Sequence, residues 1–419
     1  MLVKDINQNR ELELLILASI IAAVGFGVVA YLNMVKPMDV IIAILEFCGV
    51  FLALHWLMRV KGHAGDPLLL PIVGCLVAIG LVFIFRLRPN LLPYQLLWCA
   101  VGGLGFYIVT SLFRSPEQLQ KYKYLSGVCG ILLILSTVLF GVDIGGNKSW
   151  LIIGPLRFEP AEFAKILLVV FLAGYLVENR MLLATNTWRI GRFTLPHPLY
   201  LGPLIALWGI GLLLLVLEKD LGAALLYYGT FLSMLYIASG RKSYVAIGLA
   251  FIIAGGITSY YLFSHVRVRF DMWLDPWSDP DGRGYQIVQA LFSLGTGGIF
   301  GTGLSLGRPD YIPAVHTDFI FAAIGEELGL AGTIAVLLLF VLFIHRGFRA
   351  ALVTENQFCR LLAAGFSSLL ALQTVVIIGG VTKFLPLTGI TLPFISYGGS
   401  SMLSNFLILG LLHNISEKR

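Results

Sequence analysis

Long apolar runs, separated by polar segments of varied length, make up most of this chain. A helix needs about 20 mostly apolar residues to cross the roughly 30 Å hydrocarbon core of a bilayer. Because lipid offers no partner to backbone N–H and C=O groups, each such run is predicted to be helical. Runs of suitable length lie at 14–32, 39–57, 68–85, 94–113, 123–141, 162–178, 201–217, 221–239, 244–263, 319–344, 360–380 and 398–414. The pattern predicts an all-α polytopic membrane protein with about twelve transmembrane helices.

The composition agrees with lipid as the main solvent of this chain. Only 12% of its residues are charged and 58% are hydrophobic, whereas soluble domains carry about 25% charged residues. The net charge of +6 is explained by Lys and Arg residues in cytoplasmic loops. Since the chain has no long basic run, we expect no nucleic acid among its partners.

The distribution of basic residues predicts the orientation. An N-terminus in the cytoplasm places more Lys and Arg residues in the inside segments than in the outside segments. Cytoplasmic loops are generally the richer in these residues, so both termini are predicted to be cytoplasmic. The long loop 264–318 and the shorter loop 142–161 then lie on the extracytoplasmic face. Loops as long as the first are usually functional.

The loop 264–318 gathers charged and aromatic side chains at the predicted membrane surface. Its charged residues include Arg267, Arg269, Asp271, Asp275, Asp279 and Asp281, with Trp273 and Trp277 among them. Basic residues suit an anionic headgroup or diphosphate, and a carboxylate among apolar groups suits a general base. These residues alone do not choose between the four aspartates. A solvated loop anchored by its tryptophans is the alternative interpretation.

A second charged cluster lies where the run 162–178 begins. Arg157, Glu159, Glu162 and Lys165 occur within nine positions. Glu162 and Lys165 are three residues apart, so they share one helix face and are expected to pair. Charge at membrane depth is costly and suggests a function by default. The pair indicates either a polar cavity inside the bundle or an internal ion pair that orders it.

Further polar groups interrupt the apolar pattern. His316 and Asp318 precede the run 319–344, in which Glu326 and Glu327 follow about two turns later. The stretch 388–401, which contains Ser396, is expected to be a broken segment, because Gly and Pro interrupt its apolar residues.

Other features have simpler interpretations. Gly295–Gly303 is interpreted as flexible or tightly packed backbone, since no strand precedes it as a dinucleotide-binding motif requires. Glu218–Asp220 is predicted to be a turn between two spans, and a functional site is the alternative interpretation. Glu46 is expected to be buried or to reach the interface.

Taken in order, these pieces resemble the SEDS family (shape, elongation, division and sporulation), and most closely its RodA-type members. The matching pieces are Arg157–Lys165, Glu218–Gly222, Trp277–Pro280 with Gly284–Gln286, His316–Phe321 with Glu326–Gly329, and Pro386–Ser400. The family implies a ten-helix core, which would occupy residues 67–419. Residues 1–66 would then be an N-terminal extension of two helices.

The resemblance implies a peptidoglycan glycosyltransferase that polymerises lipid II at the outer face of the bacterial cytoplasmic membrane. It implies that Asp279 is the catalytic carboxylate, because this residue lies in the Trp-Ser-Asp-Pro motif. The predicted substrate-binding residues are Trp150, Arg157, Glu162, Lys165, His316, Asp318 and Ser396. The implied partners are lipid II, undecaprenyl diphosphate and a class B penicillin-binding protein. A divalent cation, Mg²⁺ or Mn²⁺, is a candidate cofactor without assigned ligands, and no organic cofactor is expected.

Two other functions compete with the enzyme. Intramembrane charges and a broken helix also suit a flippase that carries lipid II across the membrane without joining it. A scaffold for cell-wall synthesis proteins would instead make the loop carboxylates dispensable. The acids clustered on one outer loop favour the enzyme.

Overall fold

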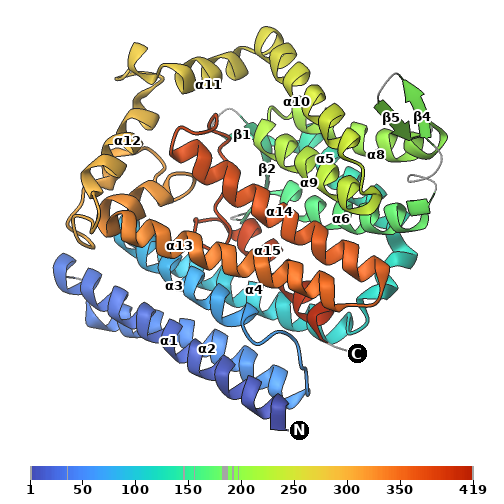
Figure 1. Cartoon of the computed structure of the whole chain (residues 1–419). Coiled ribbons are helices and arrows are strands. Elements are labelled where there is room, and N and C mark those ends of the chain that lie inside the picture. Colours follow the sequence, from blue (N-terminus) through green and yellow to red (C-terminus); the bar gives the residue numbers. More distant parts are fainter. Residues whose placement is uncertain are drawn as a thin grey trace.

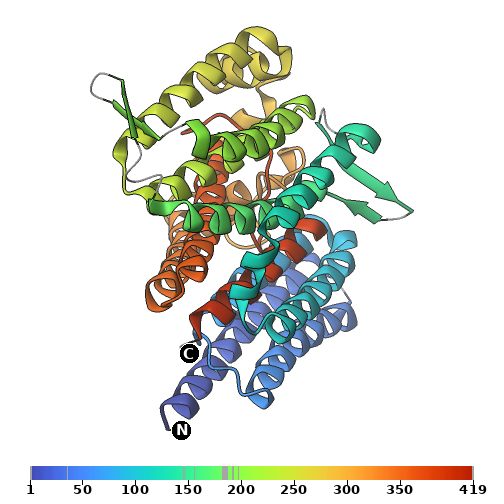
Figure 2. The same cartoon turned by 90° about the vertical axis from the view of Figure 1, so that its right-hand side faces the viewer.

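The computed structural model describes residues 2–34, 36–144, 147–154, 156–181, 187–190, 193–196 and 198–417. Long helices dominate this part of the chain (Figures 1 and 2). The helices of the first half are α1 (Leu2–Asn33), α2 (Pro37–Val60), α3 (Leu69–Leu87), α4 (Leu92–Leu112), α5 (Lys123–Phe140) and α6 (Pro160–Glu178). Those of the second half are α8 (Pro198–Leu217), α9 (Leu221–Ser239), α10 (Lys242–Leu262), α11 (Ser264–Leu274), α12 (Tyr285–Gly297), α13 (Ile320–Val353), α14 (Gln357–Val381) and α15 (Gly399–Ser416).

Each of the twelve predicted apolar runs lies on one of these helices, which confirms a polytopic all-α fold. Ten helices are long and apolar enough to cross a membrane within the described residues. In α8 the stretch Ala206–Leu217 is apolar, and buried Ser, Asn and His side chains lower the hydropathy of α15. The count of twelve spans therefore stays a prediction.

The bundle has a buried centre and an exposed periphery. In the most apolar window of α3, 83% of the residues are buried inside the protein, and in α14 the share is 78%. The corresponding share in α10 is only 6%, so few residues of this helix are buried by the rest of the protein. Figure 1 shows α10 at the edge of the bundle, beside α9 and α11.

The two N-terminal helices pack on one side of the core. α1 lies along α3 and α2 lies along α4, at the lower left of Figure 1. Inside this pair, His55 Nδ1 and Glu11 Oε1 lie 2.9 Å apart and both side chains are buried. Both ends of the chain lie toward the same end of the molecule in both views. This is consistent with termini on one side of the membrane, and their cytoplasmic location stays a prediction.

Short strands occupy loops that the sequence left without predicted structure. β1 (Val142–Ile144), β2 (Asn147–Ile153) and β3 (Leu156–Phe158) form an antiparallel sheet in the order β1-β2-β3. Figure 2 shows this sheet projecting from the bundle. A second hairpin pairs β4 (Thr187–Ile190) with β5 (Phe193–Pro196).

The long loop 264–318 contains helices of its own. α11 leads into the short helix η3 (Pro276–Ser278), and α12 follows. A second short helix, η4 (Pro309–Tyr311), precedes α13.

The glycine-rich stretch 295–303 was expected to be either flexible or tightly packed backbone, and it is tightly packed. It lies against α13 where that helix kinks, because Gly329 leaves the helical conformation at φ 66° and ψ −165°. Leu330 N donates to Gly298 O at 2.9 Å, and Gly303 N donates to Glu327 O at 3.0 Å. The single run predicted at 319–344 is thus two helical pieces that meet at Gly329.

We expect Gly297→Ala to lower the free energy of unfolding by about 1–3 kcal/mol, the usual cost of overpacking. A Cβ at this position would lie 1.9 Å from Gly325 O, which is backbone and cannot turn aside. Thermal unfolding in detergent measures the effect. Gly295→Ala in the same helix is the matched control, because no atom lies within 4 Å of its added Cβ. Equal melting temperatures for the two variants would contradict this account.

Candidate functional site

The predicted pair at the start of α6 forms. Lys165 Nζ lies 2.5 Å from Glu162 Oε2, and the side chains are 2% and 12% exposed. Ser404 Oγ donates to the same carboxylate at 2.7 Å, and Lys165 Nζ also lies 3.4 Å from Gln373 Oε1. Helices α14 and α15 therefore each contribute a polar side chain to the pair. The pair lies inside the bundle, as expected both for a polar cavity and for an ion pair that orders the bundle.

The tip Glu218–Asp220 is a turn, as predicted, but its two carboxyl groups are buried. Glu218 is 1% exposed and Asp220 is 4% exposed. Asp220 caps α9 by accepting a hydrogen bond from Ala223 N at 3.0 Å. Thr137 Oγ1 donates to Glu218 Oε1, and burial raises the pKa of Glu218 to about 8. The tip is thus part of the polar interior rather than a solvated turn.

The segment 382–398 between α14 and α15 is non-helical, as predicted for the broken stretch 388–401. Ser396 Oγ accepts from Leu392 N at 3.0 Å and donates to Thr317 O. Gln95, fully buried in α4, donates to Ser396 O and accepts from Gly398 N, both at 3.3 Å. Ser396 is itself only 4% exposed. Its hydroxyl is used to hold two loops together.

His316 and Asp318 lie against this segment. His316 O accepts from Tyr397 N at 2.9 Å, and the two rings are 5.8 Å apart. Burial, and to a lesser extent Arg88, lowers the pKa of His316 below its ordinary value. Burial raises the pKa of Asp318, against the opposing effects of the Thr317 hydroxyl and Arg269.

Arg157 is in the same neighbourhood. It is exposed on β3. Burial raises the pKa of Tyr397, and Arg157 opposes this rise through its charge. Trp150 lies on β2, opposite Val142 of β1. The adjoining strand residue Lys148 donates from its backbone N to Glu218 O at 3.1 Å, so the sheet lies against the buried tip.

Helix α11 fastens the long loop to the segment 382–398. Arg269 Nη1 lies 3.4 Å from Thr388 O, and Trp273 Nε1 donates to Lys383 O at 3.1 Å. Burial raises the pKa of both Asp220 and Asp318, and the positive charge of Arg269 offsets part of each rise. Arg269 is therefore the basic group that faces the buried acids from the outer loop.

Asp279 follows η3 and is held by its own loop. Its Oδ2 accepts from Arg283 N at 3.1 Å, and its carbonyl oxygen accepts from Gly284 N at 2.9 Å. A side chain at Gly282 would lie 2.4 Å from Asp279 Oδ1, so the glycine leaves room for the carboxylate. The side chain is partly exposed.

The structure thus joins some predicted site residues and separates others. His316, Asp318 and Ser396 meet at the segment 382–398, and Glu162 pairs with Lys165. In the described part of the chain, no hydrogen bond or ion pair links Asp279 to any of these residues. Sequence reasoning passed over Gln373 and Ser404, named Asp220 only within the charged tip, and named Arg269 only as one of several loop arginines. The sequence positions of these residues did not indicate a site, because only the fold brings them close to the Glu162–Lys165 pair and the segment 382–398.

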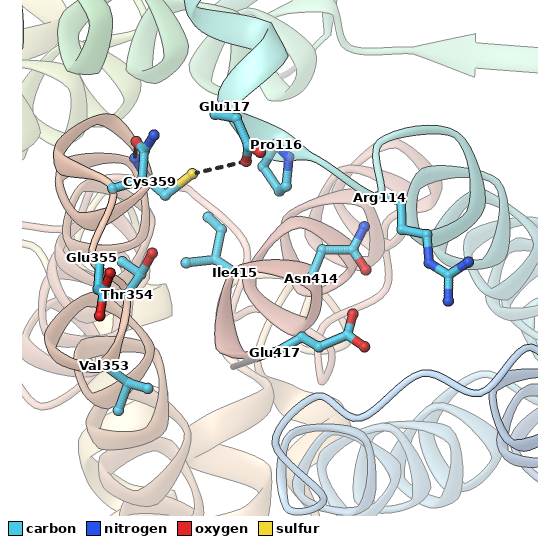
Figure 3. Close-up of a pocket in the computed structure, with 11 residues that line it drawn as sticks. Arg114, Pro116, Glu117, Val353, Thr354, Glu355, Cys359, Asn414, Ile415 and Glu417 are labelled. Carbon is cyan, nitrogen blue, oxygen red and sulfur yellow. Dashed lines mark hydrogen bonds between the residues drawn. The ribbon is translucent and has the colours of Figure 1, made fainter. Parts of the chain in front are cut away.

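A cavity lies where α13 and α15 end (Figure 3). Its volume is about 570 Å³, and it is enclosed by Arg114, Pro116, Glu117, Val353, Thr354, Glu355, Asn356, Cys359, Asn414, Ile415 and Glu417. α15 follows the segment 382–398 directly and reaches the cavity at Ile415, and α13 begins shortly after His316 and reaches it at Val353. None of the predicted site residues lines it, so it is distinct from the candidate site.

The described residues do not form a protein metal site. Among them, no three His, Cys, Asp or Glu side chains are grouped so that they could hold a metal ion. The positively charged groups beside the acids are instead Lys165, Arg157 and Arg269. A requirement for Mg²⁺ or Mn²⁺ stays a prediction.

Comparisons with known proteins agree with this fold. Residues 68–419 match the model of the family described as "Cell cycle protein", which groups FtsW, RodA and SpoVE. The chain is 44% identical to the peptidoglycan glycosyltransferase RodA of Mycobacterium tuberculosis, over 98% of this chain and 90% of the relative. It is 33% identical to the stage V sporulation protein E of Bacillus subtilis, over 86% of this chain and 99% of that protein.

Two solved structures share the architecture. A chain of a peptidoglycan synthase complex superposes with a TM-score of 0.70 at 29% identity, covering 84% of this chain and 98% of that one. RodA of Thermus thermophilus gives a TM-score of 0.61 at 29% identity, covering 86% and 99% of the two chains. The chain belongs to the FtsW/RodA/SpoVE family, called SEDS above, and is of the RodA type.

Removing one partner of the buried pair should destabilise the protein. We expect Lys165→Met to lower the free energy of unfolding by about 3 kcal/mol, because it leaves Glu162 without its ion-pair partner. The double variant Glu162→Gln with Lys165→Met should recover much of this loss. Thermal unfolding in detergent is measured for the wild type, Glu162→Gln, Lys165→Met and the double variant, which together form a double-mutant cycle. Additive losses would show that the two side chains are not coupled.

The raised pKa of Glu218 predicts a pH dependence of stability. The folded state keeps this proton up to about pH 8, whereas the unfolded chain releases it near its ordinary value. Stability should therefore fall as the pH rises between these two values and change no further above about pH 8. Melting temperatures at about pH 5.5 and about pH 8 should differ more for the wild type than for Glu218→Gln. An equal difference for both would contradict the role of this carboxyl group.

Proposed function

We propose that this chain polymerises lipid II into glycan strands at the outer face of the cytoplasmic membrane, with Asp279 as the catalytic base. The chain is a peptidoglycan glycosyltransferase of the RodA type, as 44% identity over nearly its full length supports. This similarity is the single observation that carries the enzymatic function. The outer loop and the charged cluster carry the proposed mechanism.

In this mechanism Asp279 accepts the proton of the 4-hydroxyl group of the acceptor sugar. The hydroxyl oxygen then attacks the anomeric carbon of the donor, a carbon–oxygen bond forms, and the bond to the diphosphate breaks. Undecaprenyl diphosphate leaves with the electron pair, and the anomeric configuration inverts. Partial exposure of Asp279 leaves its carboxylate accessible to a sugar. A positioned base of this kind contributes about 10²–10⁴-fold to the rate.

The leaving diphosphate needs positive charge nearby. Arg157 is exposed on β3, and Arg269 faces the buried acids beside the segment 382–398. Both can approach a diphosphate whose lipid tail lies among the helices. Lys165 is already paired with Glu162, so we assign this pair to ordering the polar interior next to the diphosphate. Such fixed charges stabilise negative charge that develops on the leaving group.

The remaining substrate contacts are proposed for the residues that border the segment 382–398. His316 keeps a neutral ring there because its pKa is lowered, and Asp318 lies beside it. Ser396 acts through its hydrogen bonds to Leu392 N and Thr317 O, so it positions these loops. Trp150 offers a partly exposed ring on the sheet.

The proposal extends to a membrane partner. A solved relative is a chain of a peptidoglycan synthase complex, which supports a class B penicillin-binding protein as the partner here. Such a partner would crosslink the strands that this chain polymerises. The RodA and FtsW relatives are named as glycosyltransferases, which favours the enzyme over the flippase and the scaffold.

Replacement of the proposed base tests the mechanism. We expect Asp279→Asn to lower glycan polymerisation from purified lipid II at least about 100-fold, since an amide cannot accept the proton. Polymer is measured by gel electrophoresis, with each protein assayed alone and with its cognate transpeptidase. Asp281→Asn is the matched control, because Asp281 is exposed two positions away in the same loop and should retain activity. Equal polymer from Asp279→Asn and wild type would remove Asp279 from catalysis.

A further inference from the structure

The outward face of α2 carries an acidic side chain at membrane depth. Glu46 is exposed, so the first of its two expected states, burial, is wrong. It lies nine residues after Pro37, which places it about 14 Å along the helix axis from that end. A glutamate side chain spans only a few ångströms, so its carboxylate does not reach either end of the helix.

The charged groups that are buried in these helices have partners within the protein. The pairs are Glu11 with His55 at 2.9 Å, Arg86 with Glu327 at 3.0 Å, and Glu162 with Lys165 at 2.5 Å. In the described part of the chain, Glu46 has no hydrogen bond or ion pair. An ionisable group inside the membrane is costly unless a partner compensates it, so a partner from outside this chain is required.

The surface around Glu46 suits close approach by another helix. Ile42, one turn before it, is 47% exposed, and Trp56 on the same face is 61% exposed. Between them lie two small residues, Gly49 and Ala53, both exposed. No atom of the protein lies within 4 Å of a Cβ built on Gly49. Small residues let helix backbones approach closely in a membrane, and polar side chains then bond across the contact.

The neighbouring helix α1 has a different surface. Its large exposed side chains between 16 and 28 are apolar, namely Ile16, Leu17, Ile20, Ile21, Val24 and Val28. Lipid alone satisfies such a face. Figure 1 shows α1 and α2 together on the outside of the bundle. The exposed faces of both helices therefore lie at the periphery, and they differ in the residues that they present.

We propose that the α2 face formed by Ile42, Glu46, Gly49, Ala53 and Trp56 docks a transmembrane helix of a partner protein that presents a basic side chain to Glu46. Charge complementarity selects this partner, because a Lys or Arg residue at matching depth neutralises the carboxylate where water does not. A second copy of this chain would instead oppose two carboxyl groups of like charge. The docking does not depend on the proposed transferase activity.

Photo-crosslinking in cells of the native bacterium tests this docking. A photoreactive amino acid at Ala53 of the full-length protein should give one crosslinked product. Mass spectrometry should identify in it a membrane protein with Lys or Arg inside an apolar segment. Glu46→Leu and Glu46→Lys should each lose the product. Changing the basic residue of the partner to Glu should restore the product in the Glu46→Lys background only.

A photoreactive residue at Ile20 on α1 is the matched control, since any product formed there should not change with Glu46→Leu. Purified Glu46→Leu protein should polymerise lipid II as the wild type does, which separates this docking from catalysis. A product that persists in Glu46→Leu overturns the proposal. So does a product with a second copy of this chain, with a partner that lacks a basic residue in its apolar segment, or with lipid alone.

Discussion

Backbone that leaves the helical conformation inside a membrane-spanning bundle must find its hydrogen-bond partners within the protein. Segment 382–398 imposes this demand on the present fold. Buried Gln95 binds it from α4 through Ser396 and Gly398, and Gln373 Nε2 donates to Thr391 O from α14 at 2.9 Å. These contacts draw helices that are distant in sequence to one place, and the charged cluster forms beside it.

The same environment explains why the acids are buried in company. Asp220 serves as a helix cap, Glu162 has an ammonium group beside it, and Glu218 keeps its proton to about pH 8 because of burial. Each is a different solution to the cost of a carboxylate away from water. A membrane enzyme that handles a diphosphate needs both signs of charge at such a depth, and this interior holds them without exposing them to lipid.

The apolar pattern was sufficient for the helices, because crossing a bilayer imposes one length and one backbone geometry. It also located the Glu162–Lys165 pair, since helical spacing makes that contact local. The sequence did not reveal the kink at Gly329, which depends on the backbone of the stretch 295–303 lying against it. Nor did it distinguish the buried tip at Asp220 from a solvated turn, because burial there comes from Thr388 and Ile390, which lie against Gly222. Contacts between distant segments are the part that periodicity does not encode.

The two hydrogen bonds from α11 to the segment 382–398, at Arg269 and Trp273, have a consequence for inhibition. They make the position of the loop that carries Asp279 depend on a part of the chain that Asp279 does not contact. A small molecule that wedged between α11 and Lys383 or Thr388 would displace the proposed catalytic carboxylate without occupying the place proposed for either sugar. Substitutions that confer resistance to such a compound would then arise around 383–388. These positions are remote in sequence from Asp279, whose displacement they would prevent.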